Sequence, residues 1–405
     1  MQASILAATL LLLSLIGFYA GRRRALAGVG GRRRELHSLP AYYGLYVALW
    51  CGLPGFALFV LWLIVGPYFR AIGLAGLVAA APAAAVAGLV WSRRRVVPGL
   101  RARNRVETTM LVVLAVLSTI SIATTVGIAL SLLFESARFF ALVPIGDFLF
   151  GLQWSPQTAL RAEQAGSSGA FGSVPLFAGT ALITLIAMAV AVPIGLMSAV
   201  YMADYAGPRV RATAKPLIEV LAGIPTVVYG FFAALTVGPL FRDVGTALGL
   251  DVASESALAA GTVMGIMIIP FVSSLSDDVM NAVPQTLRDG SYALGATKSE
   301  TIRRVVIPAA LPGIVGAVLL AVSRAIGETM IVVMAAGLAA NLTANPLEAV
   351  TTVTVQIVTL LVGDQEFDSA KTLSAFALGL TLFCVTFALN LLAMQMVRRY
   401  REKYD

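Results

Sequence analysis

Nine apolar runs of roughly 20 residues constrain the fold of this 405-residue chain more than any other feature. A bilayer has a hydrocarbon core about 30 Å thick, and a helix needs about 20 residues to cross it. Hydrophobic residues make up 59% of the chain and charged residues 12%, which excludes a soluble enzyme, a nucleic-acid-binding domain and a disordered chain. We therefore expect an all-α polytopic protein embedded in the lipid bilayer. The expected spans cover about residues 3–20, 42–66, 71–91, 109–134, 177–203, 217–240, 257–281, 312–337 and 373–397.

The positions of the basic residues indicate how these spans are oriented. With the N-terminus outside, the inward segments hold 23 Lys and Arg residues and the outward segments hold five, while Arg324 lies inside a span. Cytoplasmic loops carry an excess of Lys and Arg, so this asymmetry predicts nine helices with the N-terminus outside and the C-terminus inside. The first run has no positive charge before it, and Arg22–Arg24 follow it, so we expect an uncleaved anchor rather than a signal peptide.

The basic stretch Arg93–Arg105 divides the chain into two expected domains. Residues 1–104 form an N-terminal extension of three spans, and residues 105–405 carry the other six. The second domain has two sizeable outward loops, 135–176 and 338–372. The aromatic residues of the first loop are Phe139, Phe140, Phe148, Phe150 and Trp154. They lie either at the membrane interface or on a docking surface for a partner outside.

The sequence lacks motifs for ATP hydrolysis, metal binding and disulfide formation. None of its four lysines follows a glycine, so there is no Gly-x-x-x-x-Gly-Lys-Ser/Thr phosphate loop. Cys51 and Cys384 lie inside apolar runs, and the one histidine is His37. The net charge of +8 comes from loops that set topology, so we expect no nucleic-acid partner. We also expect no enzyme activity, no metal and no cofactor in this chain, with any ATP hydrolysed on another subunit.

Arg324 and Glu328 are the two charged residues in the run 312–337. Charges at this depth are costly, so they must face the helix bundle or a wet cavity. Their i, i+4 spacing predicts one shared helix face, flanked by Ser323 and Thr329. One hypothesis is an ion pair that locks helix packing. The other is a polar station on a transport path: the guanidinium binds an oxyanion such as phosphate, and Glu328 holds the arginine or repels anions of the wrong protonation state.

The inward loop 282–311 predicts two short helices joined at a glycine. Pro284 starts a short amphipathic helix, Gly295 supplies a turn, and Pro308 ends the second helix. The element is too polar to insert into the bilayer. It therefore lies on the membrane surface or binds a soluble partner.

The spacing within this loop resembles the "EAA" loop of ABC importer permeases. Asp289-Gly290-Ser291 is followed after three residues by Gly295, and after nine more by Val305-x-Ile307-Pro308. The family pattern is Glu-Ala-Ala, three residues, Gly, nine residues, Ile-x-Leu-Pro. In that family the loop forms a coupling helix that docks on the ATPase subunit. The resemblance implies the same role here for Asp289, Gly290, Ser291, Gly295 and Pro308, with an altered triplet.

Three further segments resemble phosphate (Pst-type) permeases. Arg324–Thr329 matches the motif Arg-Ala-x-Gly-Glu-Thr, and Ala222–Gly230 is similar to Ala-Gly-Ile-Pro-Ser/Thr-Val-Val-Tyr-Gly. Asp147–Pro156 resembles the loop before the second core helix of the PstC-type subunit. The four segments occur in the family order across about residues 105–405. The resemblance implies a six-helix type I importer permease core in a bacterial cytoplasmic membrane, which moves inorganic phosphate by alternating access.

The same resemblance implies a set of partners. These are a second permease subunit of the PstA type, an ATPase dimer that binds ATP, and a periplasmic phosphate-binding protein. It implies nothing about the three N-terminal spans. Alternatives within the class are the sister permease subunit or a permease for another oxyanion, such as sulfate or molybdate. Outside the class, the competing hypotheses are an ATP-independent secondary anion carrier or channel that uses Arg324 and Glu328, and a non-transporting membrane scaffold.

Overall fold

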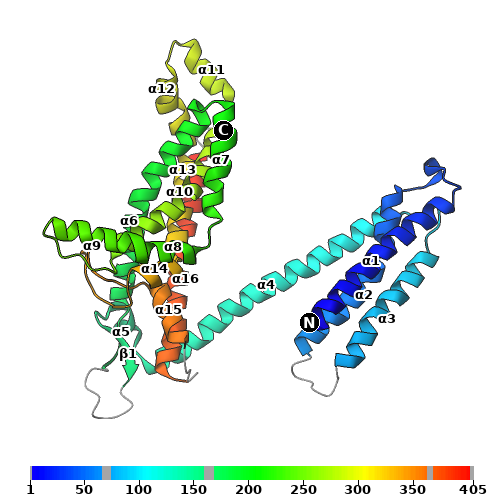
Figure 1. Cartoon of the computed structure of the whole chain (residues 1–405), viewed down its shortest axis with the longest axis horizontal. Helices are drawn as coiled ribbons and strands as arrows, with labels where there is room; N and C mark the ends of the chain where they lie inside the picture. The colour runs from blue at the N-terminus through cyan, green and yellow to red at the C-terminus, as the bar shows by residue number, and fades with distance from the viewer. Residues whose placement is uncertain (1, 66–73, 159–167, 363–367, 402–405) are drawn as a thin grey trace. The chain divides into compact units, whose positions relative to one another are not determined.

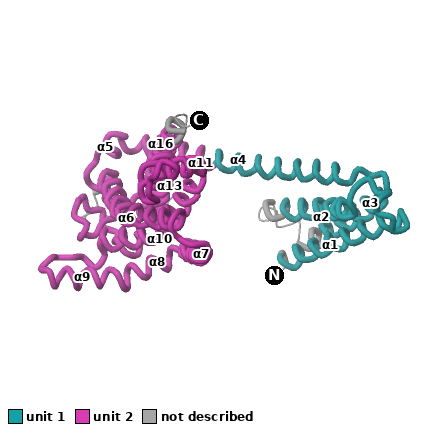
Figure 2. Tube along the Cα trace, turned by 90° about the horizontal axis from the view of Figure 1, so that it is seen from above, with its two compact units in different colours: residues 1–127 teal, residues 128–405 magenta. Residues whose placement is uncertain are grey.

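The computed structural model divides the chain into two compact units, Met1–Gly127 and Ile128–Asp405 (Figure 1, Figure 2). It describes residues 2–65, 74–158, 168–362 and 368–401. The boundary between the units falls inside one long helix, α4, whereas the sequence placed the domain boundary between residues 104 and 105.

The first unit is a bundle of three helices followed by the beginning of α4. Its elements are α1 Gln2–Ala27, the 3-10 turn η1 Arg33–Glu35, α2 Pro40–Val65, α3 Leu74–Arg94 and the first part of α4 Ala102–Leu142. Glycine lets α1 approach α2 closely, since a Cβ on Gly21 would lie 2.7 Å from the carbonyl oxygen of Tyr43. The Tyr43 hydroxyl donates to the carbonyl oxygens of Pro98 and Leu100 at 2.8 and 3.0 Å. These bonds fix the segment before α4 against α2.

The second unit consists of helices and one two-stranded hairpin. After α4 its elements are α5 Ile145–Phe150, β1 Trp154–Thr158, β2 Ser168–Phe171, α6 Val174–Val200, η2 Tyr201–Tyr205, α7 Pro208–Ala222, α8 Thr226–Phe232, η3 Ala233–Val237, α9 Gly238–Ala247, α10 Ala257–Asn281, α11 Gln285–Ala293, α12 Lys298–Thr301, η4 Ile302–Val306, α13 Ile307–Ile326, α14 Met330–Ala335, α15 Val353–Leu361 and α16 Ala370–Arg401. The elements η2, η3 and η4 are π-helical turns. Strands β1 and β2 pair antiparallel, with Trp154 opposite Phe171.

Helices α6 and α10 form the core of the second unit. They contribute Ile183, Ala187 and Ala191 from α6, and Val263, Met264, Met267 and Ile268 from α10, to one buried cluster. A Cβ on Gly265 would lie 2.8 Å from the carbonyl oxygen of Ala187, so glycine permits the close helix contact. Figure 1 shows α11 and α12 at one end of this unit and α5 and β1 at the other. We call these the α11 end and the hairpin end.

Eight helices among the described residues are long and apolar enough to cross a membrane. They confirm the expected all-α membrane fold. The run 71–91, expected as a further span, corresponds to the 21-residue helix α3. The residues 66–73 that precede α3 lie outside the described part of the chain.

The boundaries expected for the span 217–240 are wrong. Helix α7 ends at Ala222, and the apolar helical stretch that could cross the membrane runs from Thr226 to Ala247. Pro225 lies between the two helices, where its ring and its missing N–H prevent α7 from continuing. The apolar end of α7, residues 217–222, runs into the apolar residues of α8, so the sequence did not reveal that α7 is a separate amphipathic helix.

The aromatic residues of the first outward loop form a core instead of an interfacial belt. The ring of Phe139 meets those of Phe148 and Phe171 edge-to-face, at centroid distances of 5.4 and 5.5 Å. Trp154 is buried in the same cluster. Phe150 is the exception, with 77% of its surface exposed. The buried rings therefore form neither the interfacial belt nor the exposed docking surface that the sequence left open, and they stabilise the hairpin end.

Candidate functional site

Arg324 lies in the last turn of α13 and is exposed on the surface of the second unit. Its neighbours Ala321 and Ala325 are buried in the core, so the guanidinium occupies a different face of the helix. Its central carbon lies 5.8 Å from the centroid of the Phe271 ring on α10, within the range of a cation–π contact. Within the described parts of the chain, no carboxylate forms an ion pair with Arg324.

Glu328 does not pair with Arg324, so the shared helix face expected from the sequence is wrong. Helix α13 ends at Ile326, and Glu328 lies in the break that interrupts the expected span. Its Oε1 accepts hydrogen bonds from the backbone N–H groups of Met330 and Ile331 at 3.1 and 3.5 Å. These N–H groups belong to the first turn of α14 and have no partner within that helix. Glu328 therefore acts as a cap for α14.

Ser323 and Thr329 are half-buried on either side of this break. Thr354 on α15 donates from its hydroxyl to the carbonyl oxygen of Glu328 at 2.9 Å, which holds the break in place. Irregular backbone at membrane depth is tolerated only where it is buried in protein or lines a water-filled cavity. The structure thus brings the four expected residues of the 312–337 run to one interrupted helix, although it does not bring Arg324 and Glu328 into contact.

The α11 end carries the two helices joined at a glycine that the sequence predicts. Helix α11 begins directly after Pro284, and α12 follows Gly295. Gly295 adopts a φ of +83°, a conformation in which a Cβ would be strained. This glycine therefore sets the angle between the two short helices.

Pro308 does not end the second helix, contrary to expectation. Helix α12 continues through the π-helical turn η4 into α13, so Lys298–Ile326 is one candidate span. Pro308 is in the first turn of α13, just after η4. Pro308 has no N–H to donate to the preceding turn. The π-helical turn η4 changes the backbone hydrogen-bond pattern just before Pro308, so the helix continues past the proline. The α11 end is therefore joined directly to the helix that carries Arg324.

Within the triplet Asp289-Gly290-Ser291, only Ser291 is buried. Its hydroxyl lies 2.9 Å from that of Thr301, which joins α11 to α12. Asp289 is exposed and accepts a hydrogen bond from Gln285 of the same helix at 3.1 Å. Leu294 follows α11 and is 91% exposed. The outer surface of the element is thus a mixture of polar groups and a prominent apolar side chain.

A buried ion pair not expected from the sequence ties α11 to the core. Arg288 pairs with Asp204 of η2 and donates to the carbonyl oxygen of Met280 at 2.9 Å. The side chains of Arg288 and Asp204 are 10% and 4% exposed. In the sequence Arg288 counts only as a basic residue of an inward loop. Its i, i+3 spacing from Ser291 is the signal that places both residues on the inner face of α11.

A second charge cluster fixes the amphipathic helix α7 to α10. Asp277 is fully buried and accepts hydrogen bonds from Arg211 at 2.9 and 3.1 Å and from Lys215 at 3.0 Å. Asn281 donates to the same carboxylate at 2.9 Å. The hydrogen bonds that Lys215 donates to Asp277 and Asp278 raise the pKa of its amine above the ordinary value. The cluster therefore joins α7 to the C-terminal end of α10 with charge-assisted bonds.

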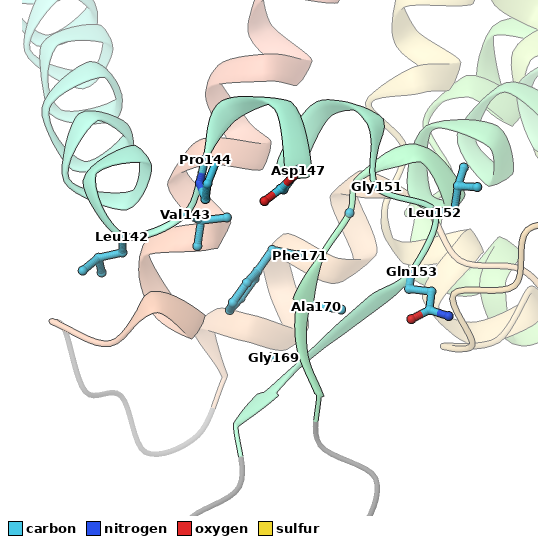
Figure 3. A pocket seen from close by; sticks show the side chains of 11 residues that line it. Leu142, Val143, Pro144, Asp147, Gly151, Leu152, Gln153, Gly169, Ala170 and Phe171 are labelled. Carbon is cyan, nitrogen blue, oxygen red and sulfur yellow. The ribbon is translucent and has the colours of Figure 1, made fainter.

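A pocket of about 680 Å³ lies at the hairpin end, against α5 and β2. Figure 3 shows three residues on its wall: Asp147 of α5, Gln153 just before β1, and Phe171 of β2. Asp147 is the one ionisable side chain among the described residues that line it. A carboxylate repels an anion, so this pocket is not suited to an oxyanion.

The second unit thus combines candidate membrane spans, one interrupted span that carries Arg324, and two short helices outside the spans at the α11 end. This is the architecture of a membrane permease subunit. The family described as binding-protein-dependent transport system inner membrane component matches residues 191–402. The chain belongs to this family and is an inner-membrane component of an ABC importer. Residues 7–81 of the first unit match a family described as phosphate ATP-binding cassette transporter.

The relatives of this chain carry related descriptions. It is 34% identical to phosphate transport system permease protein PstC of Mesorhizobium japonicum, with 67% of this chain and 84% of the relative covered. It is 32% identical to probable ABC transporter permease protein YqgH of Bacillus subtilis, with 61% and 75% covered. Its similarity to phosphate transport system permease protein PstA 1 of Mycobacterium tuberculosis, at 37% identity, covers 36% of this chain and 44% of the relative.

Proposed function

We propose that this chain is the PstC-type subunit of an importer for inorganic phosphate and that Arg324 contacts the anion in transit. The observation that supports this proposal is the exposed guanidinium of Arg324 in the last turn of a span, with no carboxylate partner in the described residues. Such a charge is costly against acyl chains, so it needs a polar environment from outside the chain. A guanidinium suits phosphate because it can donate two parallel hydrogen bonds to its oxygens.

A PstA-type subunit covers Arg324 and completes the path. The exposure of Arg324 on the second unit supports this arrangement, since a path enclosed by this chain alone would leave the side chain surrounded by its own helices. The chain covers a larger share of the PstC relative than of the PstA relative. This difference supports the assignment as PstC-type. Ser323 and Thr329 supply hydroxyls beside the path, and Glu328 maintains the break in the span.

The α11 end is the surface that binds the ATPase dimer. Asp289, Gly290 and Leu294 are exposed on this surface, and Gly295 and Pro308 set the course of the chain on either side of α12. This end faces the cytoplasm, in keeping with its basic residues, so the N-terminus is outside and the C-terminus inside. The hairpin end then faces the periplasm, where a phosphate-binding protein delivers the anion. Binding of ATP to the dimer shifts an equilibrium between outward-open and inward-open states.

The test is phosphate uptake by cells that carry the whole importer with Arg324→Ala. The expected result is a fall in uptake of roughly 100-fold or more, as for loss of a charge-assisted bond to a bound anion, with normal membrane insertion. Arg242→Ala, which removes an exposed arginine of α9, is the matched control and should leave uptake unchanged. Normal uptake by Arg324→Ala would refute the assigned role. Saturable uptake of labelled sulfate or molybdate, together with no saturable uptake of labelled phosphate, would refute phosphate as the substrate.

A further inference from the structure

We propose that a pocket in the first unit binds the headgroup of an anionic phospholipid. This arginine pocket has a volume of about 550 Å³ and lies where the C-terminal ends of α1 and α3 meet. Its basic lining residues are Arg23 and Arg24 from α1 and Arg93 from α3. Two segments about 70 residues apart in the sequence therefore place three guanidinium groups around one hollow.

The lining residues of α1 form a stripe along one face of that helix. Ile16, Tyr19, Ala20, Arg23 and Arg24 recur with the spacing i, i+3, i+4, i+7 and i+8. The first members lie within the apolar run, and the arginines follow its end near residue 20. A molecule in the pocket thus meets positive charge at the membrane boundary and apolar surface on the membrane side. This arrangement matches a phospholipid, with a charged headgroup and an acyl chain.

The charge balance of the first unit leaves the pocket arginines without a carboxylate. Residues 1–127 contain 13 arginines and two acidic residues, Glu35 and Glu107. Glu35 pairs with Arg32 at 3.0 Å, and Glu107 pairs with Arg103 at 2.6 Å. The like charges around the pocket repel one another, and the unit offers no further anion to neutralise them. The neutralising anion must come from outside this unit.

A lipid phosphate fits these observations better than a free one. A guanidinium group can donate two parallel hydrogen bonds to the oxygens of one phosphate. Basic pockets between helices at the membrane boundary bind phospholipid headgroups. Ile16 and Tyr19 are each about half exposed, which leaves apolar surface for an acyl chain. Inorganic phosphate would use the arginines and leave this apolar stripe exposed. The site is separate from Arg324 and does not depend on the identity of the transported anion.

Native mass spectrometry of the full-length protein in a neutral detergent tests the proposal. The added ligands are phosphatidylglycerol, phosphatidylcholine and inorganic phosphate, each titrated separately. Phosphatidylglycerol should bind saturably, and Arg23→Ala, Arg24→Ala and Arg93→Ala should each weaken it about tenfold or more, as expected for loss of a charge-assisted bond. Arg22→Ala is the matched control on α1, because Arg22 lies about 100° round the helix from Arg23 and does not line the pocket. Arg94→Ala is the corresponding control on α3.

Three results would overturn the proposal. Equal weakening by pocket and control variants would show attraction by net charge alone. Binding of phosphatidylcholine as tight as that of phosphatidylglycerol would remove the role of the arginines. Displacement of the lipid by millimolar inorganic phosphate at the same arginines would make this a site for a free anion.

Arg93→Lys keeps the positive charge but loses the planar guanidinium that donates two hydrogen bonds, so we expect an intermediate affinity for phosphatidylglycerol. This variant replaces Arg93→Ala if Arg93→Ala fails to fold.

Discussion

Arg288 of α11 and Asp204 of the π-helical turn η2 form a buried ion pair that connects the α11 end to the end of α6. The second carboxylate oxygen of Asp204 is also buried and has no hydrogen-bond partner among the described residues. The pair therefore depends on one guanidinium. Since α11 is otherwise largely exposed, a displacement of this helix by a bound motor would reach α6 through Arg288.

Arg288→Ala is expected to uncouple ATP hydrolysis from transport. The change leaves a buried carboxylate without its cation, which typically destabilises the local structure by about 3 kcal/mol or more. The measurement is the amount of phosphate moved per ATP hydrolysed by the importer in proteoliposomes, and this ratio should fall. Arg242→Ala, which removes an exposed arginine of α9 outside the α11 end, is the control and should keep the ratio. An unchanged ratio in an assembled Arg288→Ala importer would contradict the role of the pair.

Leu294→Asp is expected to weaken binding of the ATPase subunit. Leu294 is 91% exposed at the tip of the α11 end, and an aspartate there would have to lose its hydration in an apolar contact. The measurement is the amount of ATPase that co-purifies with the permease, expected to fall about tenfold for an apolar anchor worth at least 1.4 kcal/mol. Leu248→Asp, which changes a 70% exposed leucine after α9, serves as the control. Co-purification at the unmodified level would exclude Leu294 from the interface.

Hydropathy and basic-residue counts were sufficient to predict the all-α fold, because the backbone N–H and C=O groups of each span must form their hydrogen bonds within the span itself. They could not predict where spans are interrupted. In the run 312–337 apolar residues continue on both sides of the segment Ser323–Thr329, and its break is stabilised by a hydrogen bond from Thr354, a residue outside the run. Such tertiary contacts leave no periodic signal in the sequence. The same limit explains why the prediction that Arg324 and Glu328 share one helix face was wrong.

The two short helices of the α11 end were predictable because their signals are local. Pro284 and Gly295 fix helix start and turn through their own backbone properties, and the structure has both features where expected. Asp204 and Asp277 could not be found in this way. Each is buried by helices that are distant in sequence, and each pairs with a cation that the sequence presents only as a topology signal.

The ion pairs of Lys215 with Asp277 and Asp278 should stabilise the protein up to alkaline pH. These bonds raise the folded-state pKa of Lys215 above its unfolded value of about 10.4. The stabilisation is therefore fully present below the unfolded pKa and is lost as the pH rises through the folded pKa. We expect the Tm difference between the unmodified protein and Lys215→Met to be constant from neutral pH to about pH 9.5 and to shrink above about pH 10.5. Lys371→Met controls for general alkaline destabilisation, and a difference that grows with pH would contradict the assignment.

Substitutions of Glu328 distinguish its capping role from a charged role in transport. Glu328→Gln keeps a side-chain oxygen that can accept the bonds from Met330 and Ile331, so this variant should retain α14 and most of the uptake. Glu328→Ala removes the cap, and we expect a loss of about 1 kcal/mol of stability together with lower uptake. Thermal unfolding and phosphate uptake, measured on both variants, check the prediction. If Gln abolished uptake as completely as Ala while the protein remained stable, the negative charge itself would be required, because the two variants share only its loss.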